Sequence, residues 1–179
     1  MMKSEVSLGV LVVLVIAISH GVHSVKPGFA PLYRYFNGRD HFYTRNINEI
    51  GTAVPGRRGN HGYTSEGIQC IILSRKAADS VPLYRYWNDR EHFYTTNSNE
   101  IGVTTPGHVG NHGYRSEGIT GYCFPRQYHG TVPLYRYWNG ADHFYTTNWH
   151  EIGTNVIGHT GRHNYRCKGI ACYVYPYQA

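Results

Sequence analysis

Several features that would assign a function at once are missing from this sequence. It has no Cys-x-x-Cys pair, so a structural zinc site is not expected. Its Lys and Arg residues are scattered despite a net charge of +6, which argues against nucleic acid as a partner. No serine or cysteine recurs beside a histidine, and no nucleophile elbow is present. We therefore expect no catalytic residues, no metal, no cofactor and no enzyme activity.

The first 24 residues differ in kind from the rest of the chain. Lys3 precedes a short apolar run from Leu8 to Ile18, and small or β-branched residues follow up to Ser24. This is the layout of a cleaved signal peptide, and the run is shorter than the roughly 18 apolar residues of a membrane span. We predict a signal peptide over residues 1–24 and a secreted, extracellular protein without a membrane span.

The remaining residues, 25–179, repeat one segment three times. The string PLYRY begins at Pro31, Pro82 and Pro133, a spacing of 51 residues, and the register then holds without insertion or deletion. Fixed internal periods of this length indicate a repeat architecture. We place the repeats at 31–81, 82–132 and 133–179 within a single domain.

Each repeat is predicted to contain about four short strands. PLYRYW favours a β-strand, the Asn-Gly pair after it is typical of a hairpin turn, and HFYTT forms the returning strand. The NxxEIG segment suits one helical turn that is capped by Asn and ended by Gly. Two further strands, YRSEG and ITGYCF in the second repeat, complete the unit. No segment keeps a helical period for about 11 residues, so the chain is expected to be all-β.

Three such units can bury their apolar faces only against one another. A closed three-fold body would remove the exposed strand edges, and we predict a β-trefoil-like fold, with another three-fold β arrangement as the alternative. In the last strand of each repeat, alternate positions are apolar or small and are expected to face a narrow interior. These layers are Ile68/Ile119/Ile170, Cys70/Gly121/Cys172 and Ile72/Cys123/Val174.

The four cysteines indicate disulfide chemistry in an exported chain, with three possible pairings. Cys70 and Cys172 fall in one predicted layer, so a bridge between them and two buried free thiols both stay open. Cys167 is a further candidate, because it occurs only in the third repeat and would hold its segment in place.

The strings PLYRYWN, DHFYTT and YxSEGI resemble the signature of short repeats of unassigned function in secreted fungal, bacterial and animal proteins. The resemblance covers all three repeats, from Pro31 to the C-terminus. It implies an extracellular, trefoil-like module that is sometimes attached to secreted hydrolases. It implies neither a reaction nor a ligand, and a lectin role is an analogy from trefoils in general.

Residues that recur in every repeat are the candidates for ligand binding. Aromatic rings beside carboxylates, amides and imidazoles suit a sugar, because the ring stacks on C–H groups while polar groups bind the hydroxyls. The predicted ligand-binding residues are Asp40, His41, Tyr43, Asn60, His61, Glu66, Glu91, His92, Tyr94, Asn111, His112, Glu117, Asp142, His143 and Tyr145.

Two other recurring groups are expected to be structural. The arginines Arg34, Arg85 and Arg136 are predicted to pair across the hairpin with Asp40, Glu91 and Asp142. Glu49, Glu100 and Glu151 are expected to brace the turns, because carboxylates dispersed by symmetry do not form the paired arrangement that glycoside hydrolysis needs.

We therefore predict a secreted, non-enzymatic, lectin-like module with repeated shallow sites for glycans or glycoconjugates on cell or matrix surfaces. A structural or interaction protein of an extracellular matrix or mucus is the main alternative, and a trefoil protease inhibitor is the weaker one. Salt separates the first two, because charge-driven adhesion weakens as screening increases.

The third repeat departs from the first two within residues 162–168. Lys168 reverses the charge of Glu66 and Glu117, and three other changes fall in the same segment. We predict that this repeat has lost or changed its ligand, which leaves two equivalent sites at residues 60–66 and 111–117.

Overall fold

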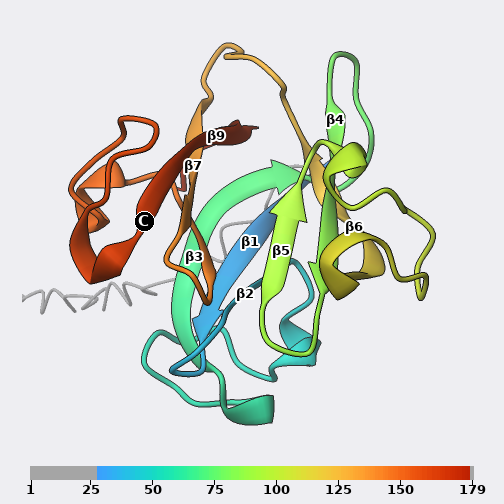
Figure 1. Cartoon of the computed structure of the whole chain (residues 1–179). Coiled ribbons are helices and arrows are strands. Elements are labelled where there is room, and N and C mark those ends of the chain that lie inside the picture. The colour runs from blue at the N-terminus through green and yellow to red at the C-terminus, as the bar shows by residue number, and fades with distance from the viewer. Residues whose placement is uncertain (1–27, 178–179) are drawn as a thin grey trace, which may run out of the picture.

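The structure, a computed structural model, describes residues 28–177, so the predicted signal peptide lies outside the described residues. This range contains nine β-strands and six short 3-10 helices, with no α-helix among the described residues (Figure 1). No helix in the described part of the chain is long and apolar enough to cross a membrane. The strands are β1 Phe29–Phe36, β2 His41–Thr44, β3 Thr64–Leu73, β4 Val81–Trp87, β5 His92–Thr95, β6 Arg115–Cys123, β7 Val132–Trp138, β8 His143–Thr146 and β9 Arg166–Val174. The predicted all-β class is confirmed.

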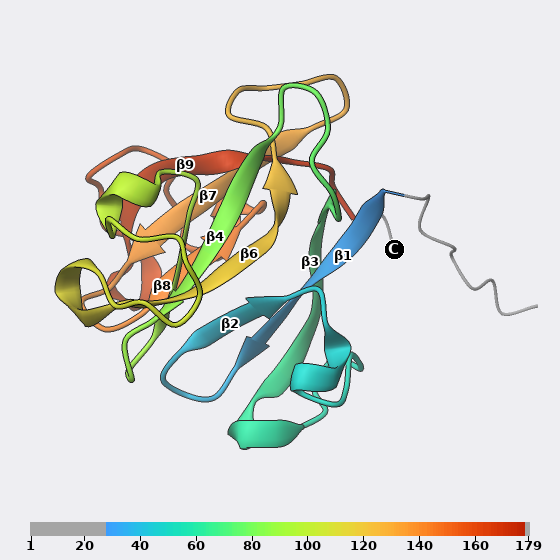
Figure 2. The same ribbon diagram turned by 90° about the vertical axis from the view of Figure 1, so that its right-hand side faces the viewer.

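Each repeat forms one three-stranded antiparallel unit. In the first repeat, β1 pairs with β2 through a hairpin and with β3 along its other edge. The other repeats copy this arrangement with β4–β6 and β7–β9 (Figure 2). Asn37 holds the first hairpin turn, because its Oδ1 accepts the N–H groups of Arg39 and Asp40 at 2.9 Å. The predicted hairpins are confirmed.

The predicted count of four strands per repeat is wrong, because the last two expected strands join into one. In the first repeat this single strand is β3, which carries two β-bulges instead of ending between them. Gly67 lies beside one bulge at φ +91°, a left-handed conformation that glycine adopts without a Cβ clash. A glycine that resembles a strand end in the sequence is thus a bulge within a strand.

The bulges also change which residues face the interior. The two layers nearer the C-terminal end of the long strand are buried as predicted. The first layer is wrong, since Ile119 and Ile170 are 45% and 46% exposed. In β3 the extra residue of the second bulge, Gln69, separates Ile68 from Cys70 and breaks the two-residue alternation.

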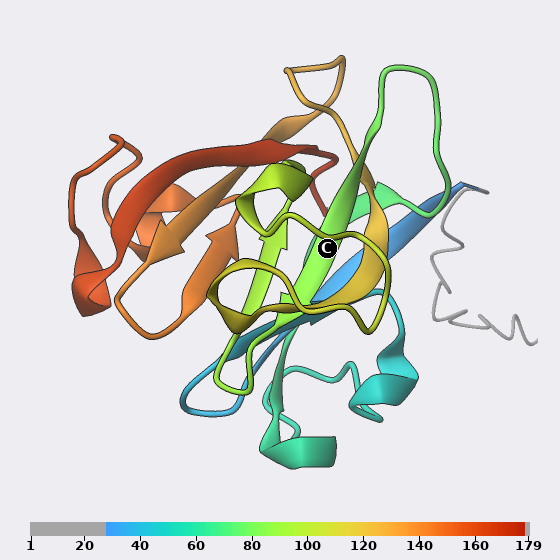
Figure 3. The ribbon, with the colours of Figure 1, turned by 45° about the vertical axis from the view of Figure 1, so that its right-hand side comes forward.

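The long strands β3, β6 and β9 contact one another in a closed cycle (Figure 3). Continuous ladders form a six-stranded sheet, β2-β1-β3-β6-β4-β5, and a three-stranded sheet, β8-β7-β9. Backbone pairs at repeat-equivalent positions close the cycle: Leu73 with Tyr122, Phe124 with Tyr173, and Tyr175 with Ile71. Each unit therefore contacts both of the others.

The main core lies where the three units meet. It takes residues from every repeat: Leu32, Leu83, Leu134, Tyr43, Tyr94, Tyr145, Cys70, Ile72, Cys123, Cys172 and Val174. Each repeat also has a smaller aromatic cluster, which in the first repeat consists of Tyr35, Phe42, Ile50 and Tyr63. The shared core covers an apolar face that no single repeat could bury alone.

One disulfide joins the second and third repeats. Cys123 is bonded to Cys172, with their Cα atoms 6.2 Å apart, while Cys70 and Cys167 are buried free thiols. Of the two alternatives left open for Cys70 and Cys172, the bridge between them is wrong, and the free buried thiol holds for Cys70 alone. The staple through Cys167 is also wrong. The side chains of neighbouring predicted layers interdigitate, because Ile72 fills the space beside Gly121. Cys172 therefore lies next to Cys123, which belongs to the neighbouring predicted layer.

We expect the double variant Cys123→Ala with Cys172→Ala to lose about 2–4 kcal/mol of unfolding free energy, because the bridge closes a long loop in the unfolded chain. Urea titration followed by fluorescence measures the loss. Peptide mapping under non-reducing conditions should recover the bridged pair and two free thiols, and a Cys70–Cys172 peptide would contradict the assignment.

Candidate functional site

Three equivalent tyrosines form a closed ring in the main core. The hydroxyl of Tyr43 donates to the Tyr145 carbonyl at 2.8 Å and accepts the Tyr145 N–H at 2.7 Å. Tyr145 makes the same two bonds to Tyr94, and Tyr94 makes them to Tyr43, at 2.6–2.9 Å. The rings meet edge to face, with centroids 5.3–5.5 Å apart. Each hydroxyl thus bridges an N–H and a C=O of another repeat.

This placement changes our interpretation of the three tyrosines. They are 1–2% exposed, and their hydroxyls are already hydrogen-bonded. Burial raises the pKa of all three, so the phenols stay neutral and can donate. We predicted them as ligand contacts, and we now assign them to holding the repeats together.

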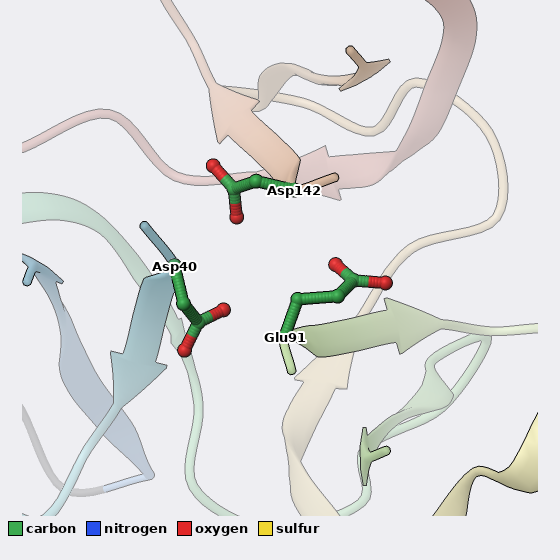
Figure 4. Close-up of side chains that lie close together, drawn as sticks. All are labelled: Asp40, Glu91 and Asp142. Atoms are coloured by element: carbon green, nitrogen blue, oxygen red, sulfur yellow. The ribbon is translucent and has the colours of Figure 1, made fainter. Parts of the chain in front are cut away.

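A second three-fold set consists of carboxylates that stand immediately before the second strand of each repeat, and Figure 4 shows the three side chains close together, arranged around a common centre. Each accepts the backbone N–H and the ring Nδ1 of a histidine from another repeat, at 2.5–2.9 Å. The pairs are Asp40 with His92, Glu91 with His143, and Asp142 with His41. A tyrosine hydroxyl of the same repeat, from Tyr63, Tyr114 or Tyr165, also donates to each carboxylate.

These carboxylates are structural anions at the junctions between repeats. Their oxygens approach within 4.8 Å, a spacing that would suit a cation, but three donors already bind each of them. Burial raises the pKa of Asp40, but hydrogen bonds from His92 and Tyr63 outweigh burial, and the pKa is lowered. The predicted pairing of Arg34 with Asp40 is wrong, because the hairpin register sets Arg34 opposite Tyr43.

Each junction between repeats forms an open cleft, which we name by the numbers of the two repeats that meet there. Cleft 1/2 has a volume of about 510 Å³, cleft 2/3 about 300 Å³ and cleft 3/1 about 500 Å³. Polar and aromatic residues from two repeats line each of them. Cleft 1/2 includes Glu49, His61, Arg85, Trp87, His92 and Glu117; cleft 2/3 includes Glu100, His112, Arg136, His143 and Lys168; cleft 3/1 includes Arg34, Phe36, His41, Glu66, Glu151 and His163.

An arginine bridges two repeats in every cleft. The terminal nitrogens of Arg85 bind both oxygens of Glu49 in the preceding repeat, at 2.9 and 3.3 Å. Its Nε lies 2.8 Å from Glu117, close enough for an ion pair although the N–H does not point at the oxygen. The guanidinium lies over the Phe42 ring, 5.0 Å from its centroid. In cleft 3/1 the corresponding residues are Arg34, Glu151, Glu66 and Phe144.

Local structure explains how both carboxylates reach the guanidinium. Glu49 ends the 3-10 helix Ile47–Glu49, which Asn46 caps as predicted, and it accepts the Thr44 hydroxyl. Glu117 is the extra residue of a bulge in β6, and bulges redirect side chains. Burial raises the pKa of Glu49, but bonds from Arg85 and Thr44 outweigh it, so this carboxyl has a lowered pKa.

An aromatic ring packs against the carboxylate-bound histidine of each junction. Trp87 lies 4.4 Å from His92, and Phe36 lies 4.3 Å from His41, centroid to centroid. Both pairs line their clefts. An apolar ring face therefore stands in the same cleft as the arginine and its carboxylates.

An exposed histidine completes each cleft. His61, His112 and His163 have φ of 54°, 56° and 55°, a left-handed conformation that is uncommon for residues other than glycine. Such strain is found preferentially at binding sites and switches. Histidine is among the residues that adopt this conformation most often after glycine, so the three exposed imidazoles occupy equivalent backbone positions that suit their residue type.

The structure separates residues that we predicted to act together. His61 lines cleft 1/2, whereas Glu66, only five positions later, lines cleft 3/1. Asn60 and Asn111 donate their side-chain amides to the Glu49 and Glu100 carbonyls and so brace the loops. The arginines, the turn glutamates and Trp87 were not predicted as cleft residues. Their recurrence in all repeats, with Phe36 in the place of Trp87, was a usable signal.

Comparison with known families identifies one domain that covers almost all of the described residues. A family model described as "Domain of unknown function (DUF5648)" matches residues 31–175. The chain belongs to this family. The DUF5648 match covers the first two repeats and the third as far as residue 175, and every residue named in the clefts lies within it. No curated protein and no solved structure matches the chain.

We expect Tyr94→Phe to lower the unfolding free energy by about 2–6 kcal/mol. The change removes one hydroxyl and leaves the buried N–H and C=O of Tyr43 without their partner, at about 1–3 kcal/mol per group. Urea titration measures the loss. The exposed Tyr128→Phe is the control and should change stability by less than about 0.5 kcal/mol. Equal effects of the two variants would contradict the tyrosine ring.

Acid should destabilise the DUF5648 domain through its paired carboxyls. Glu49, Glu100 and Glu151 have lowered pKa values in the folded chain, so the unfolded chain binds more protons. Their stabilisation is complete above the ordinary pKa of 4.5 and is lost as the pH falls through the lowered values. We expect the unfolding free energy to drop as the pH falls below 4.5.

Unfolding titrations at several pH values measure this drop. Glu49→Gln should make it smaller, whereas Asp79→Asn, at an exposed loop residue, should leave it unchanged. A pH profile that is identical in all three proteins would contradict the role of Glu49.

Proposed function

We propose that this protein is a secreted, non-enzymatic carbohydrate-binding module whose sites are the clefts between repeats. The observation that carries the proposal is the combination in cleft 1/2 of the Trp87 ring, a doubly bonded Arg85–Glu49 pair and an exposed histidine. The disulfide is consistent with an oxidising, extracellular compartment.

Sugars fit this combination of groups. The face of Trp87 offers an apolar surface for sugar C–H groups, and the carboxylates of Glu49 and Glu117 can accept bonds from hydroxyls. Arg85 already holds both carboxylates in place, so little side-chain freedom would be lost on binding. Clefts of 300–510 Å³ are at the smaller end of ligand pockets, which favours one or two sugar units.

Clefts 1/2 and 3/1 are the two equivalent sites of this proposal. Both present one arginine, two glutamates and an aromatic ring, with Trp87 in one and Phe36 in the other. Two weak sites on one chain would raise avidity on a glycan-coated surface. Our prediction of two equivalent sites is thus retained as a proposal, with its residues reassigned to the junctions.

We further propose that the three units close in the manner of a β-trefoil. The cyclic backbone pairs among β3, β6 and β9 support this, as does the ring of three tyrosines. If each long strand is divided into two at one of its two bulges, every repeat has the four strands of that fold. A crystal structure without the cyclic pairs would contradict it.

A glycan array should identify ligands, and calorimetry on the monomer should then find two equivalent binding events. We expect Trp87→Ala to weaken the site in cleft 1/2 at least tenfold, because buried aromatic contacts dominate binding energies. Trp149→Ala is the matched control, since Trp149 is not among the residues that line the three clefts, and it should leave affinity unchanged.

Two results would count against this proposal. An array without a specific hit, together with no agglutination of cells, would refute carbohydrate binding. Adhesion that disappears at high salt and ignores Trp87→Ala would instead support the alternative of a matrix or mucus protein bound through charge.

A further inference from the structure

Cleft 2/3 differs in charge from the other two. The bulge position that holds Glu66 in β3 and Glu117 in β6 holds Lys168 in β9. Lys168 lines this cleft and not the one that contains His163 of its own repeat. The charge reversal seen in the third repeat therefore alters the junction between the second and third repeats.

The arginine of this cleft also has fewer partners than its equivalents. Arg34 binds Glu66, Glu151 and Gln69. Within residues 28–177, Arg136 pairs with Glu100 alone, at 3.0 and 3.1 Å. Its side chain is 21% exposed, against 13% for Arg34 and 14% for Arg85.

The substitutions that cause this difference lie at the two bulges. Lys168 replaces the glutamate at the first bulge, and Ala171 stands at the second, where β3 has Gln69. Both changes remove an acceptor from the surroundings of Arg136 and leave its guanidinium more accessible. Cleft 2/3 thus presents two cations and one glutamate, whereas clefts 1/2 and 3/1 each present one arginine and two glutamates.

We propose that cleft 2/3 binds the anionic substituent of a glycan, a sulfate or a carboxylate, between Lys168 and Arg136. The inference rests on the proposed carbohydrate function and specifies the ligand of one of its sites. A charge-assisted hydrogen bond is about twice as strong as a neutral one, and a guanidinium held by Glu100 presents its free N–H groups in a fixed geometry. Lys168 makes no ion pair with any described residue, so its ammonium is available.

The same charges make the clefts selective. In cleft 2/3 an anionic sugar would contact Lys168. At the equivalent position of clefts 1/2 and 3/1 it would contact Glu117 or Glu66, and contact between like charges disfavours binding. A single chain would therefore join two sites for neutral sugars to one site for an acidic sugar. Glycans that carry both kinds of unit would be bound most tightly by the whole protein.

Calorimetry with three disaccharides tests the inference: a sulfated chondroitin unit, its unsulfated uronic acid counterpart and neutral N-acetyllactosamine. We expect one binding event for at least one of the two anionic probes. Lys168→Glu gives the third repeat the residue of the first two, so the fold should tolerate it, and it should weaken the anionic probe at least tenfold. The reverse variant, Glu117→Lys, should create a second anionic event in cleft 1/2.

The outcomes separate this inference from the function on which it rests. Neutral sugars that bind while neither anionic probe does, or anionic binding that Lys168→Glu leaves unchanged, would overturn the inference alone. Binding of the sulfated probe only, or of both anionic probes, would identify which anion the cleft accepts. No binding of any sugar, here and on the array, would refute both proposals.

Discussion

Buried hydrogen bonds from the three ring tyrosines and the three carboxylates join each repeat to the others. The hydroxyl of Tyr43 binds the backbone of Tyr145, and the carboxylate of Asp40 binds His92. An unpaired buried group of this kind would cost about 1–3 kcal/mol. One repeat or two would leave several such groups without partners, so the three repeats depend on one another for polar satisfaction as much as for their shared apolar core.

The same dependence creates the clefts. Arg85 belongs to the second repeat, yet the carboxylate that holds both of its terminal nitrogens, Glu49, comes from the first. A surface formed in this way is rigid, because its polar groups are already ordered before any ligand arrives. It is also easily altered, since a single change at a bulge, such as Lys168, modifies one junction and leaves the strands intact.

Features within a repeat could be predicted from the sequence, and contacts between repeats could not. The hairpins and the turn capped by Asn46 follow from local residue preferences. The bulges do not, because the extra residue is defined only by the partner strand. We paired Arg34 with the nearby Asp40, whereas the true partner, Glu151, is 117 positions away. Because the residues recur, the sequence shows that each arginine has three candidate glutamates. Only the three-dimensional arrangement shows which repeat supplies the partner.

Cleft 3/1 has one further consequence, because Arg34 and Glu151 join the beginning of the folded domain to its end. A ligand bound in this cleft would contact both the first and the third repeat. The two repeats could separate at that junction only after the ligand had dissociated. Because the ligand would bind only the closed form, a higher ligand concentration would lower the fraction of molecules that are open at this junction. Occupancy of this one junction would therefore slow proteolysis that depends on opening there.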